Sequence, residues 1–332
     1  MSPKRQVSRN WWQFTLGLCC VIGLTLLAYF WLPLPSVDSG KSPTEPPPRK
    51  IQNTLELQIA LARSGFSPGS IDGALGSQTR QALTAYQRAH ELPPTGEWDV
   101  ATRKQIMIRD PVYAYIELSE ADLGRIDPPP TTWRERGQRS RMAYHSALEM
   151  VAETSQSHPD LIVRLNPEIN WDGLHPGQRI KVPHIPVVRT RGSAEHLRIS
   201  LSERTLQAID PAGRILFHAP VSIARRVDKR PSGELKVAVR VKNPNYTFNP
   251  AILNATAARE GIIEKFIIQP GPNNPVGSVW IGLNLPSYGI HGTPEPEQVG
   301  RTESSGCFRL SNWNAETLLG LVHDGMSVYV EP

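Results

Sequence analysis

The chain has 332 residues, more than a single hydrophobic core usually serves, so two to three domains are expected. Hydrophobic residues make up 39% and charged residues 20%, a balance typical of globular proteins. The net charge of +5 is mild, and neither a Lys/Arg-rich block nor a nucleic-acid motif stands out in the body of the chain. These features exclude nucleic acid as the expected partner and better suit an anionic polymer or a membrane surface.

The N-terminus has the pattern of a membrane anchor. A basic flank precedes an uncharged run from Phe14 to Leu32, whose 19 residues at about 1.5 Å each can just cross a bilayer core of about 30 Å. Aromatic side chains stand at both ends of this run, where interfacial Trp and Tyr belong. We therefore expect a cytoplasmic tail (residues 1–12) and a single transmembrane helix (13–34) in the inner membrane, with the body in the periplasm.

A cleaved signal peptide is the alternative for this segment. Its apolar region would span about 7–15 residues and precede a small-x-small site. Here the run is longer, and Val37-Asp38-Ser39 is the best candidate for such a site. The following residues, 35–50, are rich in Pro and Ser and predict an extended linker.

Residues 51–110 predict a small three-helix domain. Asn53, with Glu56 three residues later, is a capping signal, and Ser77 and Asp99 are placed to cap two more helices. Pieces that match a known pattern are Leu57-Gln58, Gly65-Phe66, Ile71-Asp72-Gly73, Gly76, Thr79-Arg80, Ala82, Tyr86-Gln87, Leu92, Thr95-Gly96 and Thr102. With these pieces the segment resembles the type 1 peptidoglycan-binding domain. That resemblance implies cell-wall targeting; a generic helical bundle is the alternative.

The middle of the chain predicts a linker (111–141) followed by a small α+β module (142–192). The linker carries three consecutive prolines, whereas the module offers an amphipathic helix around Ala147–Val151 and a short strand at Ile180–Pro183. The pieces "LIVRLNP" and "LHPGQRIKVP" resemble a LysM module, which implies a grip on glycan chains. A LysM-derived spacer that no longer binds glycan is the alternative. Trp171 is a candidate for stacking on a sugar or for packing in the core.

Residues 193–332 predict a mainly antiparallel β-sandwich. Alternating segments surround a turn at Pro211-Ala212-Gly213, and further strands are indicated at Gly233–Pro244, Val279–Ile281 and Ser327–Val330. One helix is expected late in the module, with its cap near Asn314.

This last module holds the candidate catalytic pair. Cys307 is the only thiol outside the apolar N-terminal run, and His291 precedes it by sixteen residues. An imidazole within hydrogen-bond reach would take the thiol proton and hold a thiolate as an ion pair, ready to attack a carbonyl. Gly306 allows a tight turn whose amides can face one oxyanion. Gly292 allows close approach, and its carbonyl could orient the imidazole.

The segment around this pair resembles the L,D-transpeptidase (YkuD) family. His291-Gly292-Thr293 and Ser304-Ser305-Gly306-Cys307-Phe308-Arg309-Leu310 stand as that family's H-G-T and S-x-G-C-x-R-L elements. Other matching pieces are Pro231-Ser232-Gly233, "PGPNNPVG" (270–277), Tyr288-Gly289-Ile290 and Asn312. Many members have histidine where this chain has Ser305, so no second histidine is present to assist.

The resemblance implies that Cys307 is the nucleophile and His291 the general base and acid, with the Gly306 and Cys307 amides as oxyanion donors. Arg309 is a candidate for holding a substrate carboxylate or, equally, for bracing the loop through an acidic side chain. Tyr288 either lines the site or packs, and Ser304 is placed to bond to the loop backbone.

The implied reaction is acyl transfer on peptidoglycan. Cys307 would attack the amide before the terminal D-alanine of a tetrapeptide stem, and an amine of a neighbouring stem or of a wall-attached protein would resolve the thioester. An L,D-carboxypeptidase, which uses water as acceptor, and a non-catalytic wall-binding scaffold are the alternatives. The remaining histidines show no metal-ligand spacing, so neither a metal nor another cofactor is expected.

Overall fold

The computed structural model describes residues 47–186, 192–304 and 306–332. The predicted cytoplasmic tail, the predicted transmembrane helix and most of the 35–50 linker lie outside the described residues, as does Ser305. Within the described part of the chain, no helix is both long and apolar enough to span a bilayer.

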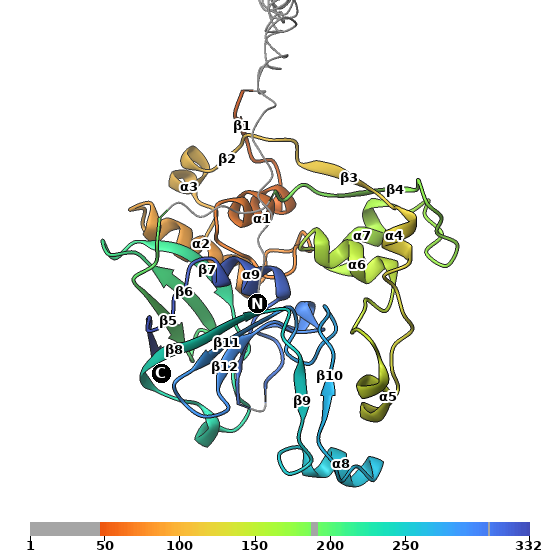
Figure 1. The fold of residues 1–332 in the computed structure, drawn as a ribbon. Helices are drawn as coiled ribbons and strands as arrows, with labels where there is room; N and C mark the ends of the chain where they lie inside the picture. The colour runs from red at the N-terminus through yellow and green to blue at the C-terminus, as the bar shows by residue number, and fades with distance from the viewer. Residues whose placement is uncertain (1–46, 187–191, 305) are drawn as a thin grey trace, which may run out of the picture. The chain divides into compact units, whose positions relative to one another are not determined.

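The first module consists of three helices tied by a short strand pair (Figure 1). The Asn53 and Asp99 side chains cap α1 (Thr54–Arg63) and α3 (Val100–Gln105), as their positions predict. The N-cap of α2 (Ser77–Ala89) is Gly76 rather than Ser77, and no side chain caps this helix. β1 (Arg49–Lys50), in the segment assigned to the linker, pairs with β2 (Met107–Ile108) and joins the two ends of the module.

The middle module has a strand–helix–helix–strand order around an insertion. β3 (Tyr113–Glu117) pairs antiparallel with β4 (Arg179–Pro183). Along the chain, α6 (Ala147–Thr154) and α7 (Pro159–Leu165) lie between these two strands. The insertion carries α4 (Glu120–Leu123) and α5 (Trp133–Gln138). The segment 111–141, assigned to a linker from its prolines, therefore contains a strand and two short helices. β3 escaped prediction because its partner lies more than sixty residues away in sequence.

The C-terminal module is built on one mixed sheet of eight strands, not on two separate sheets. Its strand order is β13-β12-β11-β8-β14-β5-β6-β7, and β12 with β13 and β14 with β5 run parallel while the other neighbours are antiparallel. The strands are β5 (His196–Ser200), β6 (Thr205–Ile209), β7 (Ile215–Pro220), β8 (Gly233–Lys242), β11 (Val279–Leu283), β12 (Gly289–His291), β13 (Phe308–Arg309) and β14 (Ser327–Glu331).

The sheet curls until its two edges meet. The first residues of the long strand β8 pair with β14 and its later residues pair with β11, so this one strand belongs to both halves. Beyond the end of β7, Ser222 forms an antiparallel bridge with Arg309 of β13. The enclosed core receives side chains from both halves and from α9 (Asn312–Leu319), whose N-cap is Ser311. The predicted sandwich is therefore wrong in detail, because β8 and this bridge make the two faces continuous.

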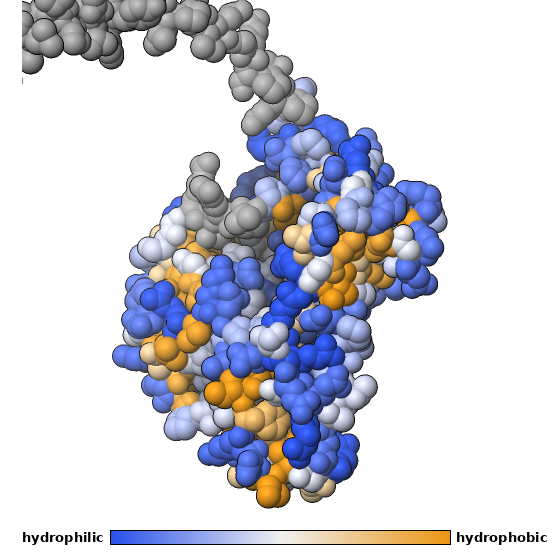
Figure 2. Space-filling model, turned by 45° about the vertical axis from the view of Figure 1, so that its right-hand side comes forward, coloured by the Kyte–Doolittle hydropathy of each residue, from blue (hydrophilic) through white to orange (hydrophobic). Residues whose placement is uncertain are grey.

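A hairpin projects from this module toward the insertion of the middle module. β9 (Tyr246–Phe248) and β10 (Phe266–Ile268) flank α8 (Asn254–Glu260), and aromatic rings join the hairpin to Trp133 of α5. Hydrophobic surface gathers at the end of the molecule that carries α8 (Figure 2). Its exposed residues in this region are Ile252, Ile263 and Ile267.

The three modules pack against one another directly. Phe66 of the first module bridges to His218 of β7, and the core around α1 and α2 includes Ile209 and Ile215 of the large sheet. Ile71 bridges to Ser157 of the middle module. With these contacts, residues 46–332 form one compact unit rather than domains joined only by linkers.

Candidate active site

Three neighbouring strands bring the predicted residues onto one face of the sheet. β12 pairs with β11 through His291 and Trp280, and with β13 through His291 and Arg309. Because paired residues project to the same side and successive residues alternate, Cys307, directly before β13, shares this face. The residues that alternate with them and enter the core are Ile281, Ile290 and Phe308.

The His291 imidazole is held in one tautomer. Its Nδ1 lies 2.6 Å from the carbonyl oxygen of Gly292, which can only accept, so Nδ1 carries the proton and Nε2 keeps a lone pair. The ring is buried and stacks on Trp280, with ring centroids 5.7 Å apart. Burial lowers the pKa of His291 to about 4; the Gly292 contact opposes the shift and nearby Arg309 adds to it. The imidazole is therefore neutral at neutral pH.

The Cys307 thiol is partly buried, and Sγ donates a hydrogen bond to the Ser287 carbonyl oxygen at 3.4 Å. Burial raises the pKa of this thiol, while the Gly289 backbone and the Arg309 charge act to lower it. No hydrogen bond joins Sγ to the His291 ring in this state, both residues being among those described. The resting pair is thus a neutral thiol and a neutral imidazole, not the ion pair expected from the sequence.

A serine braces the turn in front of the cysteine. Ser304 Oγ donates to the Cys307 carbonyl oxygen at 2.6 Å and accepts from the Gly306 N–H at 3.2 Å. The expected bond between Ser304 and the loop backbone is therefore present. It also occupies the Gly306 amide, one of the two candidate oxyanion donors. The Tyr288 ring lies beside Gly306, with Cε1 3.9 Å from the position that a Cβ there would take.

Arg309 holds the loop through a backbone oxygen. Its Nη2 donates to the Glu303 carbonyl at 2.8 Å, and its own backbone exchanges two hydrogen bonds with Ser222. The Glu303 carboxylate lies instead within ion-pair distance of three other arginines, Arg204, Arg225 and Arg230. Arg309 thus braces the segment through this carbonyl, and among the described residues no carboxylate lies within ion-pair distance of it. The more distant Glu295 favours its charge, and that charge acts on both Cys307 and His291.

Asn312, at the start of α9, clamps the backbone next to the histidine. Its Oδ1 accepts from the Ser278 and Thr293 amides, both at 3.1 Å. A Cβ at Gly292 or Gly277 would overlap this oxygen, so both positions need glycine for the clamp to close. Because Gly292 supplies the carbonyl that fixes the imidazole, the clamp reaches His291 through one residue.

Two family models match this chain. Residues 51–106 match the "Putative peptidoglycan binding domain", and residues 194–330 match the YkuD "L,D-transpeptidase catalytic domain". At the level of domains, residues 51–106 thus match a peptidoglycan-binding domain, and residues 194–330 match a YkuD-type catalytic domain that follows it. The chain is 26% identical to "Putative L,D-transpeptidase YkuD" of Bacillus licheniformis, over 56% of this chain and 93% of the relative, and 25% identical to its Bacillus subtilis namesake, over 55% and 92%.

Solved structures similar to this chain include an L,D-transpeptidase from Xylanimonas cellulosilytica. That comparison covers 86% of this chain and 98% of the other, at 15% identity and a TM-score of 0.34. L,D-transpeptidase 3 from Mycobacterium tuberculosis gives the same TM-score, 0.34, over 48% of this chain and 77% of the other.

Two residues that the sequence did not indicate lie next to His291 and Cys307. Trp280 covers the imidazole, and the absence of a side chain at Gly289 makes room for its ring. Tyr246 of the β9–β10 hairpin lies near Cys307: burial raises the pKa of this phenol, and the thiol's charge adds to the shift. Neither residue lies in the quoted motifs, so strand register and hairpin position were needed to find them.

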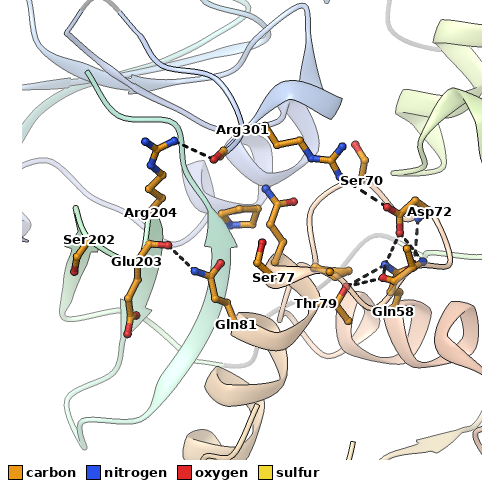
Figure 3. Close-up of a pocket in the computed structure, with 16 residues that line it drawn as sticks. Gln58, Ser70, Asp72, Ser77, Thr79, Gln81, Ser202, Glu203, Arg204 and Arg301 are labelled. Carbon is orange, nitrogen blue, oxygen red and sulfur yellow. Dashed lines mark hydrogen bonds and ion pairs between the residues drawn. The ribbon is translucent and has the colours of Figure 1, made fainter. Parts of the chain in front are cut away.

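A polar cavity of about 530 Å³ lies between the peptidoglycan-binding domain and the YkuD domain (Figure 3). Its walls are joined across the seam, because Gln78 donates to the Val299 carbonyl and Gln81 to the Glu203 carbonyl, both at 2.7 Å. Arg301 lies 3.8 Å from the Asp72 carboxylate. The cavity is thus part of the interface between these two domains. Residues 299–301 of this interface belong to the segment that connects His291 to Cys307.

Three or more His, Cys, Asp or Glu side chains placed to hold a metal ion are not found among the described residues. In the middle module, Trp171 packs against the core formed by α6, α7 and the β3–β4 pair.

Proposed function

We propose that this chain is a peptidoglycan L,D-transpeptidase with Cys307 as the nucleophile and His291 as the general base. The observation that carries the proposal is the state of His291. The Nδ1 proton is donated to the Gly292 carbonyl, so Nε2 keeps its lone pair, and the ring lies on the same sheet face as Cys307. The YkuD match of residues 194–330 supplies the reaction class.

In the first step, Sγ attacks the carbonyl of the amide that precedes the terminal D-alanine of a stem. His291 Nε2 takes the thiol proton, and the C–N bond breaks as this proton passes to the leaving amine. The products are a thioester on Cys307 and free D-alanine. Because both groups rest neutral, the proton moves only as the new C–S bond forms.

The charge that develops on the carbonyl oxygen needs amide donors. The Cys307 amide is the donor that we assign, and the Gly306 amide would join it by leaving its long bond to Ser304. The Arg309 guanidinium favours the thiolate and disfavours a resting imidazolium, so it stabilises attack while keeping His291 unprotonated.

In the second step, the amine of another stem attacks the thioester and releases the thiol. We propose that the peptidoglycan-binding domain and the LysM-like middle module hold the wall near this site. We also propose that the Phe14–Leu32 run anchors the chain once in the inner membrane with the body in the periplasm. Protease added from the periplasmic side should cleave the body if this topology is right.

Intact-mass analysis of the full chain tests the enzymatic proposal. A carbapenem, whose β-lactam amide a thiol can open, should add its whole mass to the wild type and none to Cys307→Ala. A tetrapeptide muropeptide should leave an adduct that lacks D-alanine. A folded wild type whose mass stays unchanged with both compounds would exclude enzymatic acyl transfer and favour the scaffold.

Product analysis separates the remaining alternatives. Joined stems identify a transpeptidase, and a peptide attached to an added protein identifies protein attachment. A shortened stem without any partner identifies an L,D-carboxypeptidase, because water then resolves the same thioester.

A further inference from the structure

A carboxyl group of the middle module is buried against the YkuD domain. Glu153 of α6 is only 9% exposed, and its Oε1 accepts from Asn312 Nδ2 at 3.0 Å and from the Tyr144 hydroxyl at 3.3 Å. Asn312 donates also to the Pro272 carbonyl at 3.2 Å. Burying a carboxyl group costs free energy unless it has such partners, so this contact is a specific feature of the interface between the middle module and the YkuD domain.

The contact continues to the catalytic histidine in three short steps. Glu153 fixes the amide end of Asn312, which turns Oδ1 toward the Ser278 and Thr293 amides. That oxygen lies against Gly292, whose carbonyl holds the Nδ1 proton of His291. Without Glu153, Nδ2 keeps only the Pro272 carbonyl, so the amide loses one of the two acceptors that fix which end faces the loop.

A second set of bonds docks the same helix independently of Asn312. Glu149, one turn before Glu153, accepts from Asn273 Nδ2 at 2.7 Å, and Asn273 donates also to the Ala143 carbonyl. The Met142 amide donates to the Pro270 carbonyl. The docking of α6 therefore has one arm that ends on Asn273 and Pro270 in the 270–274 segment, and one arm that runs through Asn312 to His291.

We propose that Glu153 is a positioning residue for the acyl-transfer site, through which the docked middle module sets the tautomer and place of His291. The inference rests on the proposed function of Cys307 and His291. It assigns a role to a side chain that lies outside the YkuD domain, and it makes the middle module part of the catalytic machinery as well as a wall-binding candidate.

The charges around Glu153 give this role a pH signature. Glu149 on the same helix and Glu316 on α9 disfavour its ionisation, Tyr144 bonds to it, and Arg125 lies over the Tyr144 ring. Burial raises the pKa of Glu153 to about 8, so the folded chain holds this proton more tightly than the unfolded chain. The stability from docking is therefore complete below the ordinary carboxyl range and is lost as the pH rises through about 8.

Three variants of the full chain in detergent test the proposal, with the rate of carbapenem adduct formation as the readout. Glu153→Ala removes one of the two acceptors of Asn312 Nδ2, and we expect the rate to fall at least about tenfold. Glu153→Gln keeps a carbonyl acceptor but cannot ionise, so its rate should match wild type near pH 7. The ratio of the Glu153→Gln rate to the wild-type rate should then rise above pH 8, because only the wild type ionises at residue 153 and loses docking stability there. The titrations of Cys307 and His291 are common to both proteins and cancel in this ratio.

Glu149→Ala is the matched control, since it breaks the other arm. It should lower the thermal unfolding temperature as Glu153→Ala does, yet keep the wild-type rate below pH 7 in the folded protein. Because Glu149 disfavours the ionisation of Glu153, its loss should move the pH-dependent change assigned to Glu153 to lower pH. Equal slowing by both alanine variants would overturn the positioning role in favour of general docking. A Glu153→Ala rate equal to wild type would overturn it outright. A wild type that forms no adduct would remove the proposed function itself, and the inference with it.

Discussion

A methyl group at Gly292 tests the clamp between Asn312 and the histidine. In Gly292→Ala the new Cβ would overlap Asn312 Oδ1 and lie 3.2 Å from both Asn312 Cγ and Gly277 Cα. Asn312 is 1% exposed and is held by hydrogen bonds at both ends of its amide, so it has little room to withdraw. The substitution must therefore displace either the asparagine or the backbone that fixes His291.

The expected cost follows from these contacts. Overpacking a closed site costs about 1–3 kcal/mol. Weakening the bonds from the two buried amides to Oδ1 adds about 1 kcal/mol each. A total of about 3–5 kcal/mol corresponds to a fall in the unfolding temperature of about 6–20 °C for a large unit such as this one. The rate of adduct formation should fall about 100-fold in the protein that remains folded, since the Gly292 carbonyl moves with the backbone.

Gly306→Ala is the steric control for this measurement. A Cβ at Gly306 meets only the Tyr288 ring, at an ordinary contact distance of 3.9 Å, and Gly306 is not among the glycines with positive φ. Calorimetry should therefore show that Gly306→Ala keeps its free energy of unfolding within about 0.5 kcal/mol. If Gly292→Ala unfolds at the wild-type temperature and forms the carbapenem adduct at the wild-type rate, the clamp argument is refuted.

Two further predictions concern the same loop. The rate of adduct formation should fall on the acid side only as the pH approaches about 4, because burial lowers the pKa of His291 and keeps the base neutral below the ordinary histidine range. A fall in rate near pH 6.5, while circular dichroism shows a folded protein, would contradict this. Ser304→Ala removes the acceptor of the Gly306 amide and the donor to Cys307, and should cost about 1–3 kcal/mol in thermal unfolding together with slower adduct formation; unchanged stability and rate would show that the turn holds without it.

Helix caps, tight turns and short motifs could be predicted from the sequence, because they depend on residues close together in the chain. Asn53 and Asp99 cap their helices because a side-chain oxygen three residues upstream can reach an unsatisfied amide. The turn at residues 211–213 separates β6 from β7 as expected. The candidate pair, His291 and Cys307, lies in two short motifs sixteen residues apart, so it too could be proposed without knowing the fold.

Features that depend on distant partners could not be predicted in this way. β14 pairs in parallel with β5 across about 130 residues of sequence, and the pairing of β8 with both β14 and β11 then joins the two expected halves into one curled sheet. Trp280 meets His291 only because the β11–β12 register aligns them. Glu153 reads as an ordinary polar residue of an amphipathic helix until a second module covers it.

The resting electrostatics of the site explain why these distant contacts matter. A thiolate is the species that attacks a carbonyl and also the one that oxidants reach first. Here burial keeps Cys307 a thiol and His291 neutral, so reactivity must come from geometry at the moment of attack and not from a standing ion pair. Geometry of that kind requires an imidazole that cannot turn. The Gly292 carbonyl, the Asn312 clamp and the Glu153 carboxyl supply this constraint one after another. The neutral pair therefore depends on the packing of the middle module against the C-terminal module.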